Sequence, residues 1–431
     1  MRRQKITTLF TLVVLLCCLP AIGESLTYPA PVPRTGQTTP YGTGDDGALR
    51  MGVAWPSPRF TDNGNGSVTD NLTGLIWLKN ANCFPGESNE GLDWFKALAA
   101  ANALASGSCG LTDGSHAGDW RLPNVNELQS LTDYNPFNPT LPTGHPFVGV
   151  QLEGYPYWSS TICVNYTGNA WDVSMSNGAV SPFGDINYGQ PVWPVRGGQS
   201  GSLDTLASSV QGAAENGLGD SHSARAVATT YPAPIPKTGL TTSYIAGDDG
   251  ALQKGVALPS PRFTDNGNGT VTDNLTGLIW LKNANCFDHQ TWTQALADAN
   301  GLVSGNCGLT DGSHAGDWRL PNVNELQSLI DYGHVYPTLP AGHPFSSVQY
   351  KSEMSYYWSS TSGAYGTDEG WYVYMALGYA GGHDKTLTNF HYVWPVRSGQ
   401  SGSSNKTNFD FNADGKADVI WRNANTGQVW M

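Results

Sequence analysis

The fold of this chain is decided by a stretch that occurs twice, CGLTDGSHAGDWRLPNVNELQSL, at residues 109–131 and again at residues 307–329. The segment PNVNE within it predicts the start of a helix. Asn124 can cap the first turn, and Glu127, three residues on, can bond back to the cap backbone in a capping box. Glu325 takes the same place in the second occurrence. We therefore interpret both glutamates as caps rather than catalytic acids.

The repetition extends in both directions from this stretch. The other repeated motifs are PSPRFTDNGNG (56–66 and 259–269), VTDNLTGLIWLKNANCF (68–84 and 271–287), YWSST (157–161 and 357–361) and VWPVR (192–196 and 393–397). The chain is thus a tandem duplication, with a first repeat at residues 28–197 and a second repeat at residues 231–398. Each repeat is long enough to bury its own core, so we expect each to fold alone.

Two stretches without apolar periodicity flank the second repeat. Residues 198–230 are rich in Gly, Ser, Ala and Asn, which is typical of a flexible linker, and residues 399–408 form a shorter one. We expect the first linker to let the two repeats move independently.

Short strands and two helices are predicted in each repeat. Residues 59–62, 67–70 and 75–78 suit strands, because the Asn- and Gly-rich segments between them tolerate positive φ. Apolar residues from Trp94 to Leu104 fall on one helical face, and the same stripe begins again at Trp292. With the capped helix described above, this pattern predicts an α+β fold.

The first 23 residues have the features of a secretory signal peptide. Basic residues precede an apolar run, which ends in the small-x-small pattern Ala21-Ile22-Gly23. Leu16 stands where a lipoprotein signal needs a small residue, so we expect ordinary cleavage and a secreted or cell-surface protein, periplasmic or extracellular. No later segment is long and apolar enough to predict a transmembrane helix.

The remaining chain is acidic. The full sequence carries 22 basic and 35 acidic residues, and loss of the three basic residues of the signal leaves 19 against 35, a net charge of −16. Such a surface repels polyanions, which argues against nucleic acid as a partner.

Five cysteines remain after the signal peptide. The duplication places two pairs equivalently, so in an oxidising compartment we expect the disulfides Cys83–Cys109 and Cys286–Cys307. Cys163 has no counterpart and is expected to be free. None of the spacings is that of a structural zinc site.

Candidates for catalysis are weak. The acidic pairs 45–46 and 248–249 lie in Gly-Asp-Asp-Gly loops, and His116, His314, His145 and His343 lie in loops as well. Asp in such loops caps turns, and loop histidines usually bond to backbone. We therefore expect that the protein is not an enzyme, with an enzyme of unknown type as the less favoured alternative.

The ordered motifs resemble the Lcl C-terminal domain family, which is named for the tip of a bacterial collagen-like adhesin. The series FTDNGNG, TVTDNLTGLIW, DWRLPNVNELQSL, YWSST and VWPVR carries the resemblance, which covers nearly all of both repeats. It implies a surface-displayed domain similar to the C-type lectin fold and, for the adhesin, binding of sulfated polysaccharide. A sulfated ligand requires clustered Lys and Arg, so this part is not expected to apply to an acidic chain.

The end of the chain, residues 409–431, resembles one truncated FG-GAP or VCBS repeat. The resemblance implies a Ca²⁺ ion, the only cofactor we expect, held by side-chain oxygens and one backbone carbonyl of Asp410, Asn412, Asp414, Lys416 and Asp418. An Asn/Asp/Gly-rich turn without calcium would give a similar pattern, so both interpretations stay open.

The function that we predict is binding of a polysaccharide or another surface ligand, such as a protein, by two linked lectin-like repeats. Its alternative is a structural part of a cell-envelope assembly. Accessible aromatic rings that differ between the repeats or lie in loops suit stacking on sugars. The candidates are Trp55, Tyr188, Tyr365, Tyr379 and His383.

Overall fold

The computed structural model describes most of the duplicated region. The described residues are 28–86, 91–152, 155–197, 231–351, 355–364, 366–385 and 390–398, together with the backbone of two short strands, β17 (Trp421–Arg422) and β18 (Val429–Trp430). Tyr28–Gly399 is one compact unit, and the rest of the chain is a second one. The signal peptide, both linkers and the predicted calcium ligands lie outside the described residues.

The two repeats contain nearly the same elements in the same order. The first has α1 (Asp46–Leu49), β1 (Phe60–Asp62), β2 (Ser67–Asp70), β3 (Leu75–Leu78), α2 (Trp94–Ala103), α3 (Val125–Gln129), β4 (Tyr157–Ile162), β5 (Asn169–Val173), β6 (Val180–Asp185) and β7 (Val195–Gly197). The second has α4 (Asp249–Leu252), β8 (Phe263–Asp265), β9 (Thr270–Asp273), β10 (Leu278–Leu281), β11 (His289–Gln290), α5 (Trp292–Gly301), α6 (Val323–Gln327), β12 (Tyr356–Ser362), β13 (Glu369–Tyr374), β14 (Ala380–Asp384), β15 (His391–Tyr392) and β16 (Val396–Ser398).

The strands form three sheets within this unit, and the mixture of few helices with mostly antiparallel strands confirms the α+β class. Each repeat has a four-stranded sheet, in the orders β1-β2-β3-β7 and β16-β10-β9-β8. The third sheet runs through both repeats in the order β11-β15-β12-β13-β14-β6-β5-β4. Its two halves meet where Ala380 of β14 pairs with Val180 of β6.

Local sequence explains the small sheets. In the turn between β1 and β2, Asp62 accepts a hydrogen bond from the backbone of Gly64, and Asn65 accepts two from Ser67. Gly66 has φ +84°, and a Cβ there would lie 2.3 Å from the carbonyl oxygen of Gly110. Only glycine fits that position.

The predicted helices are also present. The apolar stripe of α2 is buried, and the Asp93 side chain caps the first turn by accepting from the backbone of Lys96. The helices α3 and α6 have the predicted capping boxes, from Asn124 with Glu127 and from Asn322 with Glu325.

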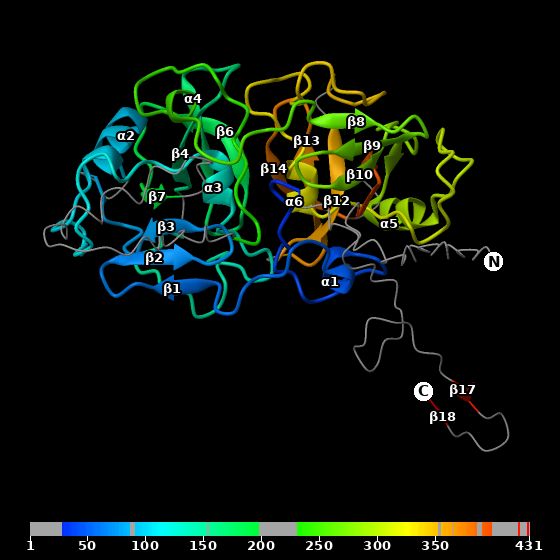
Figure 1. Ribbon diagram of the computed structural model, residues 1–431, viewed down its shortest axis with the longest axis horizontal. Coiled ribbons are helices and arrows are strands. Elements are labelled where there is room, and N and C mark those ends of the chain that lie inside the picture. Colours follow the sequence, from blue (N-terminus) through cyan, green and yellow to red (C-terminus); the bar gives the residue numbers. More distant parts are fainter. Residues whose placement is uncertain are drawn as a thin grey trace, which may run out of the picture. The chain divides into compact units, whose positions relative to one another are not determined.

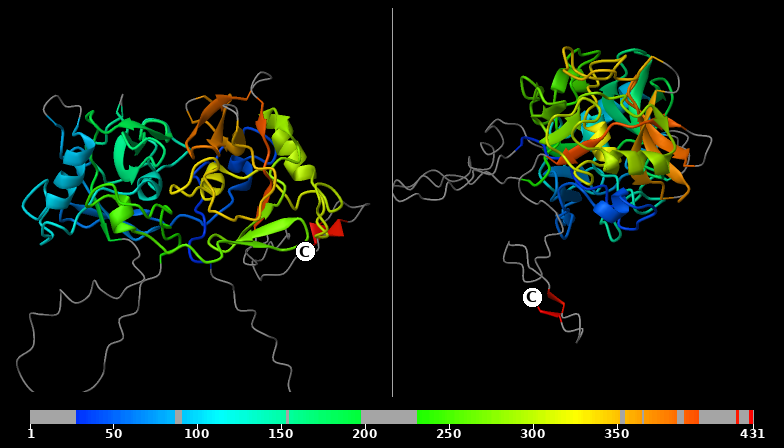
Figure 2. Two further views of the ribbon diagram at one scale, coloured as in Figure 1. Left: turned by 90° about the horizontal axis from the view of Figure 1, so that it is seen from above. Right: turned by 90° about the vertical axis from the view of Figure 1, so that its right-hand side faces the viewer.

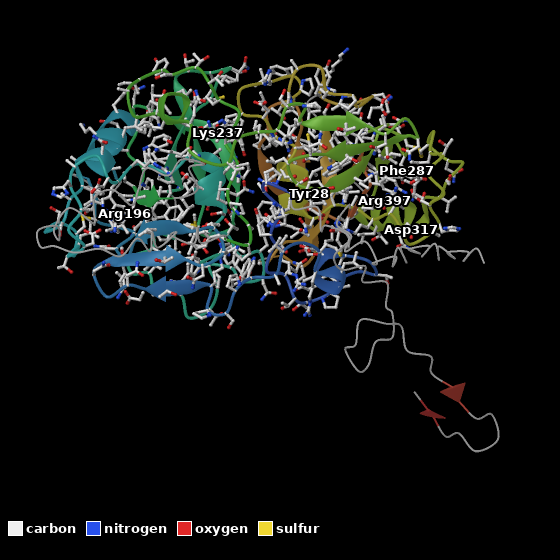
Figure 3. All side chains as sticks on the ribbon, in the orientation of Figure 1. Tyr28, Arg196, Lys237, Phe287, Asp317 and Arg397 are labelled. Carbon is white, nitrogen blue, oxygen red and sulfur yellow. A yellow bond between two sulfur atoms is a disulfide. The ribbon has the colours of Figure 1, made fainter. Side chains whose placement is uncertain are left out.

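The segments that begin the two repeats are exchanged. We call residues 28–55 the first arm and residues 231–258 the second arm. The helix α1 of the first arm packs on β12 of the second repeat, and α4 of the second arm packs on β4 of the first. Figures 1 and 2 show α1, in blue, among the yellow and orange elements of the second repeat, and Figure 1 shows α4 beside the first-repeat elements α2 and β4. In Figure 3, Tyr28 lies with the second repeat and Lys237 with the first.

Reciprocal hydrogen bonds anchor the arms. Asp46 Oδ2 of the first arm accepts from the Thr361 hydroxyl at 2.8 Å, and Asp249 Oδ2 of the second arm accepts from the Thr161 hydroxyl at 2.9 Å. Each carboxylate also accepts from a threonine of its own arm, Thr35 at 2.6 Å for Asp46. All these groups are buried.

The core is continuous across the repeats. One cluster of buried apolar residues includes side chains of both, and the pairs Tyr134–Trp371 and Trp171–Tyr332 stack edge to face between them, with ring centroids 4.9 and 4.8 Å apart. The expectation of independent movement is therefore wrong, and so is the expectation that each repeat folds alone, because the repeats share their arms, a sheet and a core. A linker sequence alone carries no information about contacts between the domains it joins.

The two predicted disulfides, Cys83–Cys109 and Cys286–Cys307, are formed. Cys163 is free and buried, and burial raises the pKa of its thiol.

Candidate functional site

The predicted ligand-binding residues lie at three different places. Tyr188 lines a cleft in the first repeat, Trp55 lines a second cleft between the arms, and Tyr379 and His383 belong to an aromatic cluster in the second repeat. Tyr365 lies outside the described residues. The structure thus does not bring these candidates together in a single site.

The cleft in the first repeat, which we call the β6 cleft, has a volume of about 520 Å³. It lies against β5 and β6 and against the segment that follows β6. Three aromatic side chains line it and remain exposed, Tyr155 at 43%, Phe183 at 59% and Tyr188 at 70%. Rings held open to solvent at the rim of a cleft are available for stacking.

Two buried polar side chains form part of the cleft wall. Asp172 of β5 is 4% exposed, and Gln190 is 8% exposed. Gln190 Nε2 donates to Asp172 Oδ2 at 3.3 Å, and Gln190 Oε1 has no hydrogen-bond partner among the described residues. Burial raises the pKa of Asp172 to about 7, partly offset by the bond from Gln190. Gln190 Oε1 thus retains unused hydrogen-bonding capacity beside Asp172 in the cleft wall.

Gly184 lies against the Trp158 ring and Asp172 in the cleft wall. A Cβ at this position would lie 2.3 Å from the Trp158 ring and 2.8 Å from Asp172 Oδ2. Any side chain on Gly184 would therefore collide with the cleft wall.

The equivalent region of the second repeat is filled by aromatic side chains. Alignment of the repeats places Tyr372 where Asp172 stands, His391 where Gln190 stands and His383 where Gly184 stands. The ring of Tyr372 lies 4.3 Å from that of His383, and His383 Nδ1 lies 2.9 Å from His391 Nε2. The cluster is completed by Tyr356, Tyr374 and Tyr379.

Burial disfavours the protonated form of both histidines. It lowers the pKa of His391 to about 3, with the neighbouring His383 as a further cause. Burial also lowers the pKa of His383. The second repeat thus has a packed aromatic cluster where the first repeat has the β6 cleft.

The second cleft, which we call the central cleft, lies between the arms and has a volume of about 100 Å³. Its walls come in equivalent pairs from the two repeats, such as Val32 with Ile235 and Arg59 with Arg262. Trp55 breaks this symmetry, because Leu258 stands at its place in the second repeat. The Trp55 ring lies 4.4 Å from the Arg59 guanidinium.

Some of the weak catalytic candidates have structural roles. Asp45 and Asp248 cap α1 and α4. Glu127 pairs with Arg121 through two hydrogen bonds of 2.5 and 2.6 Å, in addition to its capping bond. His116 and His314 are exposed, and each approaches an Asp only at 4.0 and 3.9 Å.

The described part of the chain shows no group of three or more His, Cys, Asp or Glu side chains close enough to hold a metal ion. Among the same residues, no helix has the length and apolar character needed to cross a membrane.

Sequence reasoning missed Asp172 and Gln190. The signal that could have revealed them is the difference between the repeats. At both positions a polar residue of the first repeat is replaced by an aromatic residue in the second.

Comparison with known proteins gives one result. Neither a curated protein nor a solved structure matches the chain significantly. The family model of the Lcl C-terminal domain matches residues 66–196 and 269–397, more than half of the sequence. The two matched regions hold α2, α3, α5 and α6 and the β6 cleft with its second-repeat equivalent. The chain therefore belongs to the Lcl C-terminal domain family and carries two copies of that domain.

Proposed function

We propose that this protein is a secreted or surface-displayed, non-catalytic binding module that recognises a neutral polysaccharide through the β6 cleft. The single observation that carries the proposal is the wall of that cleft, where Gln190 Oε1 has no hydrogen-bond partner among the described residues and lies with buried Asp172 beside three exposed aromatic rings. Sugars offer hydroxyl groups that can bond to the polar wall and apolar ring faces that can stack on the aromatic rings.

The charge of the lining favours a neutral ligand. The residues that line the β6 cleft include Asp172 and Asp185 but neither Lys nor Arg. Their other polar groups are hydroxyls and amides from Ser, Asn and Gln side chains. A sulfated chain would meet two carboxylates and no cation, which is unfavourable.

A domain similar to the C-type lectin fold, stabilised by one disulfide per repeat, suits this role outside the cytoplasm. In our proposal the first repeat carries the glycan site. The second repeat contributes an arm and part of the sheet, since aromatic side chains occupy its equivalent position. A single glycan site in the first repeat thus replaces the bivalent binding that the duplication alone suggests.

A glycan array with the full-length mature protein tests the proposal. We expect signals on neutral glycans and none on sulfated ones, and calorimetry with a soluble oligosaccharide from the array then gives the affinity. Tyr188→Ala and Gln190→Leu should each weaken binding by about tenfold, through lost stacking and a lost hydrogen bond. Tyr244→Ala is the matched control, because Tyr244 is 49% exposed and does not line the β6 cleft.

Three results would contradict the proposal. Equal loss in the Tyr244→Ala control would show that the effect is not specific to the cleft. Absence of binding across neutral and sulfated glycans would favour the structural role in an envelope assembly. Shortening of the oligosaccharide during incubation would show that Asp172 and Asp185 act as catalytic carboxylates and not as binding groups.

A further inference from the structure

The central cleft contains buried polar atoms without partners. Arg59 Nη1, Thr132 Oγ1 and Gln327 Nε2 have no hydrogen-bond partner among the described residues, and all three residues line the cleft. Each side chain belongs to a residue that is at most 6% exposed. Unpaired buried donors are unfavourable, so three of them around one cleft point to an acceptor that occupies it.

The two arginines are held in the same way from both repeats. Nε and Nη2 of Arg59 donate to Asp70 at 3.3 and 3.2 Å, and Nη2 also donates to the Ser130 carbonyl. Nε and Nη2 of Arg262 donate to Asp273 at 2.7 and 2.9 Å. In neither arginine does Nη1 take part in these bonds. Both guanidinium groups are thus fixed in place, and that of Arg59 keeps an unpaired Nη1.

The charge around the cleft is opposite to that of the chain as a whole. The sequence carries a net charge of −13, yet the cleft is lined by Arg34, Arg59, Lys237 and Arg262 and by no Asp or Glu. Arg34 and Lys237 occupy equivalent positions in the two arms, and Arg34 is exposed to solvent. Because Arg59 and Arg262 are paired with Asp70 and Asp273, the excess positive charge comes from Arg34 and Lys237, and it favours an anion in the cleft.

The size and walls limit what this anion is. Apolar side chains of both arms, Val32 and Ile235 among them, line the cleft together with Leu72 and Leu275. A volume of about 100 Å³ limits the ligand to a small molecule. Apolar walls of this extent favour a ligand with one charged end and a short hydrocarbon part.

We propose that the central cleft is a second ligand site, which binds a small aliphatic monocarboxylate. The carboxylate oxygens accept hydrogen bonds from Arg59 Nη1, Thr132 Oγ1 and Gln327 Nε2, and the hydrocarbon part packs against Val32 and Ile235. The site uses residues of both repeats and both arms, so it exists only in the exchanged structure. It is independent of the polysaccharide site proposed above.

Calorimetry of the full-length mature protein with sodium butyrate tests this inference, with butyramide as a neutral probe of nearly the same shape. We expect butyrate to bind at least about tenfold more tightly than butyramide, because only the carboxylate gains charge-assisted hydrogen bonds. Sodium sulfate serves as a probe for anion binding without a hydrocarbon part, and we expect it to bind more weakly than butyrate.

Two variants locate the site. Thr132→Val removes an unpaired buried hydroxyl and keeps the shape, so we expect weaker butyrate binding without loss of thermal stability. Arg59→Lys keeps a cation for Asp70 but removes the free Nη1, and should weaken butyrate binding by about tenfold. Tyr188→Ala, which alters the β6 cleft, should leave butyrate binding unchanged.

The inference is overturned if butyrate shows no binding at about 10 mM, a result that would mean water satisfies the three donors. It is equally overturned if butyramide binds as well as butyrate, or if Thr132→Val and Arg59→Lys both bind butyrate like the original protein. Loss of butyrate binding in Tyr188→Ala would place the ligand in the β6 cleft instead.

Discussion

Single residues decide that the two repeats differ at the candidate site. Asp172 and Gln190 leave a cleft in the first repeat, whereas Tyr372 and His391 fill the equivalent space in the second with rings. The surrounding strands are paired in the same way, β4 with β5 and β12 with β13. A change of side-chain volume within an unchanged sheet is therefore enough to open or close this region.

Two other residues, Asp46 and Asp249, are expected to make stability depend on pH, in the same direction as Asp172. Burial raises the pKa of each carboxyl from 3.8 to about 7, and the charged groups nearest to them are Glu325 and Arg319 for Asp46 and Glu127 and Arg121 for Asp249. A pKa raised in the folded state means that folding favours the protonated acid. The stabilisation is full below pH 3.8 and is lost as the pH rises through about 7.

We therefore predict that the free energy of unfolding falls by on the order of a few kcal/mol between about pH 6 and about pH 8.5, measured by guanidinium denaturation. His391 works in the opposite direction, because its lowered pKa makes stability fall as the pH drops below 6.5, so the test range lies mostly above that value. The double variant Asp46→Asn with Asp249→Asn should show a flatter profile. An identical slope in the double variant would contradict the assignment.

At the scale of elements, helix caps also join the repeats. Asn124 caps α3 by accepting from the backbone of Glu127, and its Nδ2 donates to the Lys254 carbonyl of the second arm at 3.2 Å. Asn322 does the same for α6 and the Met51 carbonyl of the first arm, at 3.1 Å. The same side chain thus starts a helix and holds an arm.

Asn124→Ala should consequently lower the free energy of unfolding by more than the loss of an ordinary cap does. We expect the free energy of unfolding to fall by about 2 kcal/mol or more for Asn124→Ala and by about 1 kcal/mol for Asp93→Ala. Asp93 is the comparison because its side chain caps α2 at a partly exposed position. Chemical denaturation of both variants measures the difference. Equal losses would show that the bond to Lys254 adds nothing to stability.

At the scale of the whole unit Tyr28–Gly399, the exchanged arms make the two repeats the halves of one structure. Each half completes the other with its arm, through contacts such as Asp46 with Thr361 and Asp249 with Thr161. The arrangement resembles a dimer with exchanged segments whose two subunits are covalently joined.

Cutting the connection between the repeats should therefore leave them together. A protease site inserted within residues 198–230 allows this cut, and after cleavage we expect one peak in size-exclusion chromatography and one unfolding transition in calorimetry. The first repeat produced alone, residues 28–197, should form a dimer by exchanging arms with a second copy. Separate elution of the two cleaved halves would contradict this prediction.

The sequence by itself determined the local structure of this protein. The turn after β1, the apolar face of α2, the capping boxes of α3 and α6 and the two disulfides were all predicted from motifs. These features depend on residues close together in the chain, or on cysteine pairs that the duplication reveals. Periodicity and capping chemistry are visible at that range.

Only the tertiary structure decided how the repeats combine and where the clefts lie. The contacts of α1 with β12 and of α4 with β4 join residues hundreds or tens of positions apart, and two similar repeats offer equivalent partner surfaces, such as Thr161 and Thr361, twice. A sequence pattern cannot say which copy of a surface an arm occupies, because the local chemistry is the same in both. The β6 cleft and the central cleft exist because strands and arms from distant segments meet there, so their polar walls become recognisable only after the chain has folded.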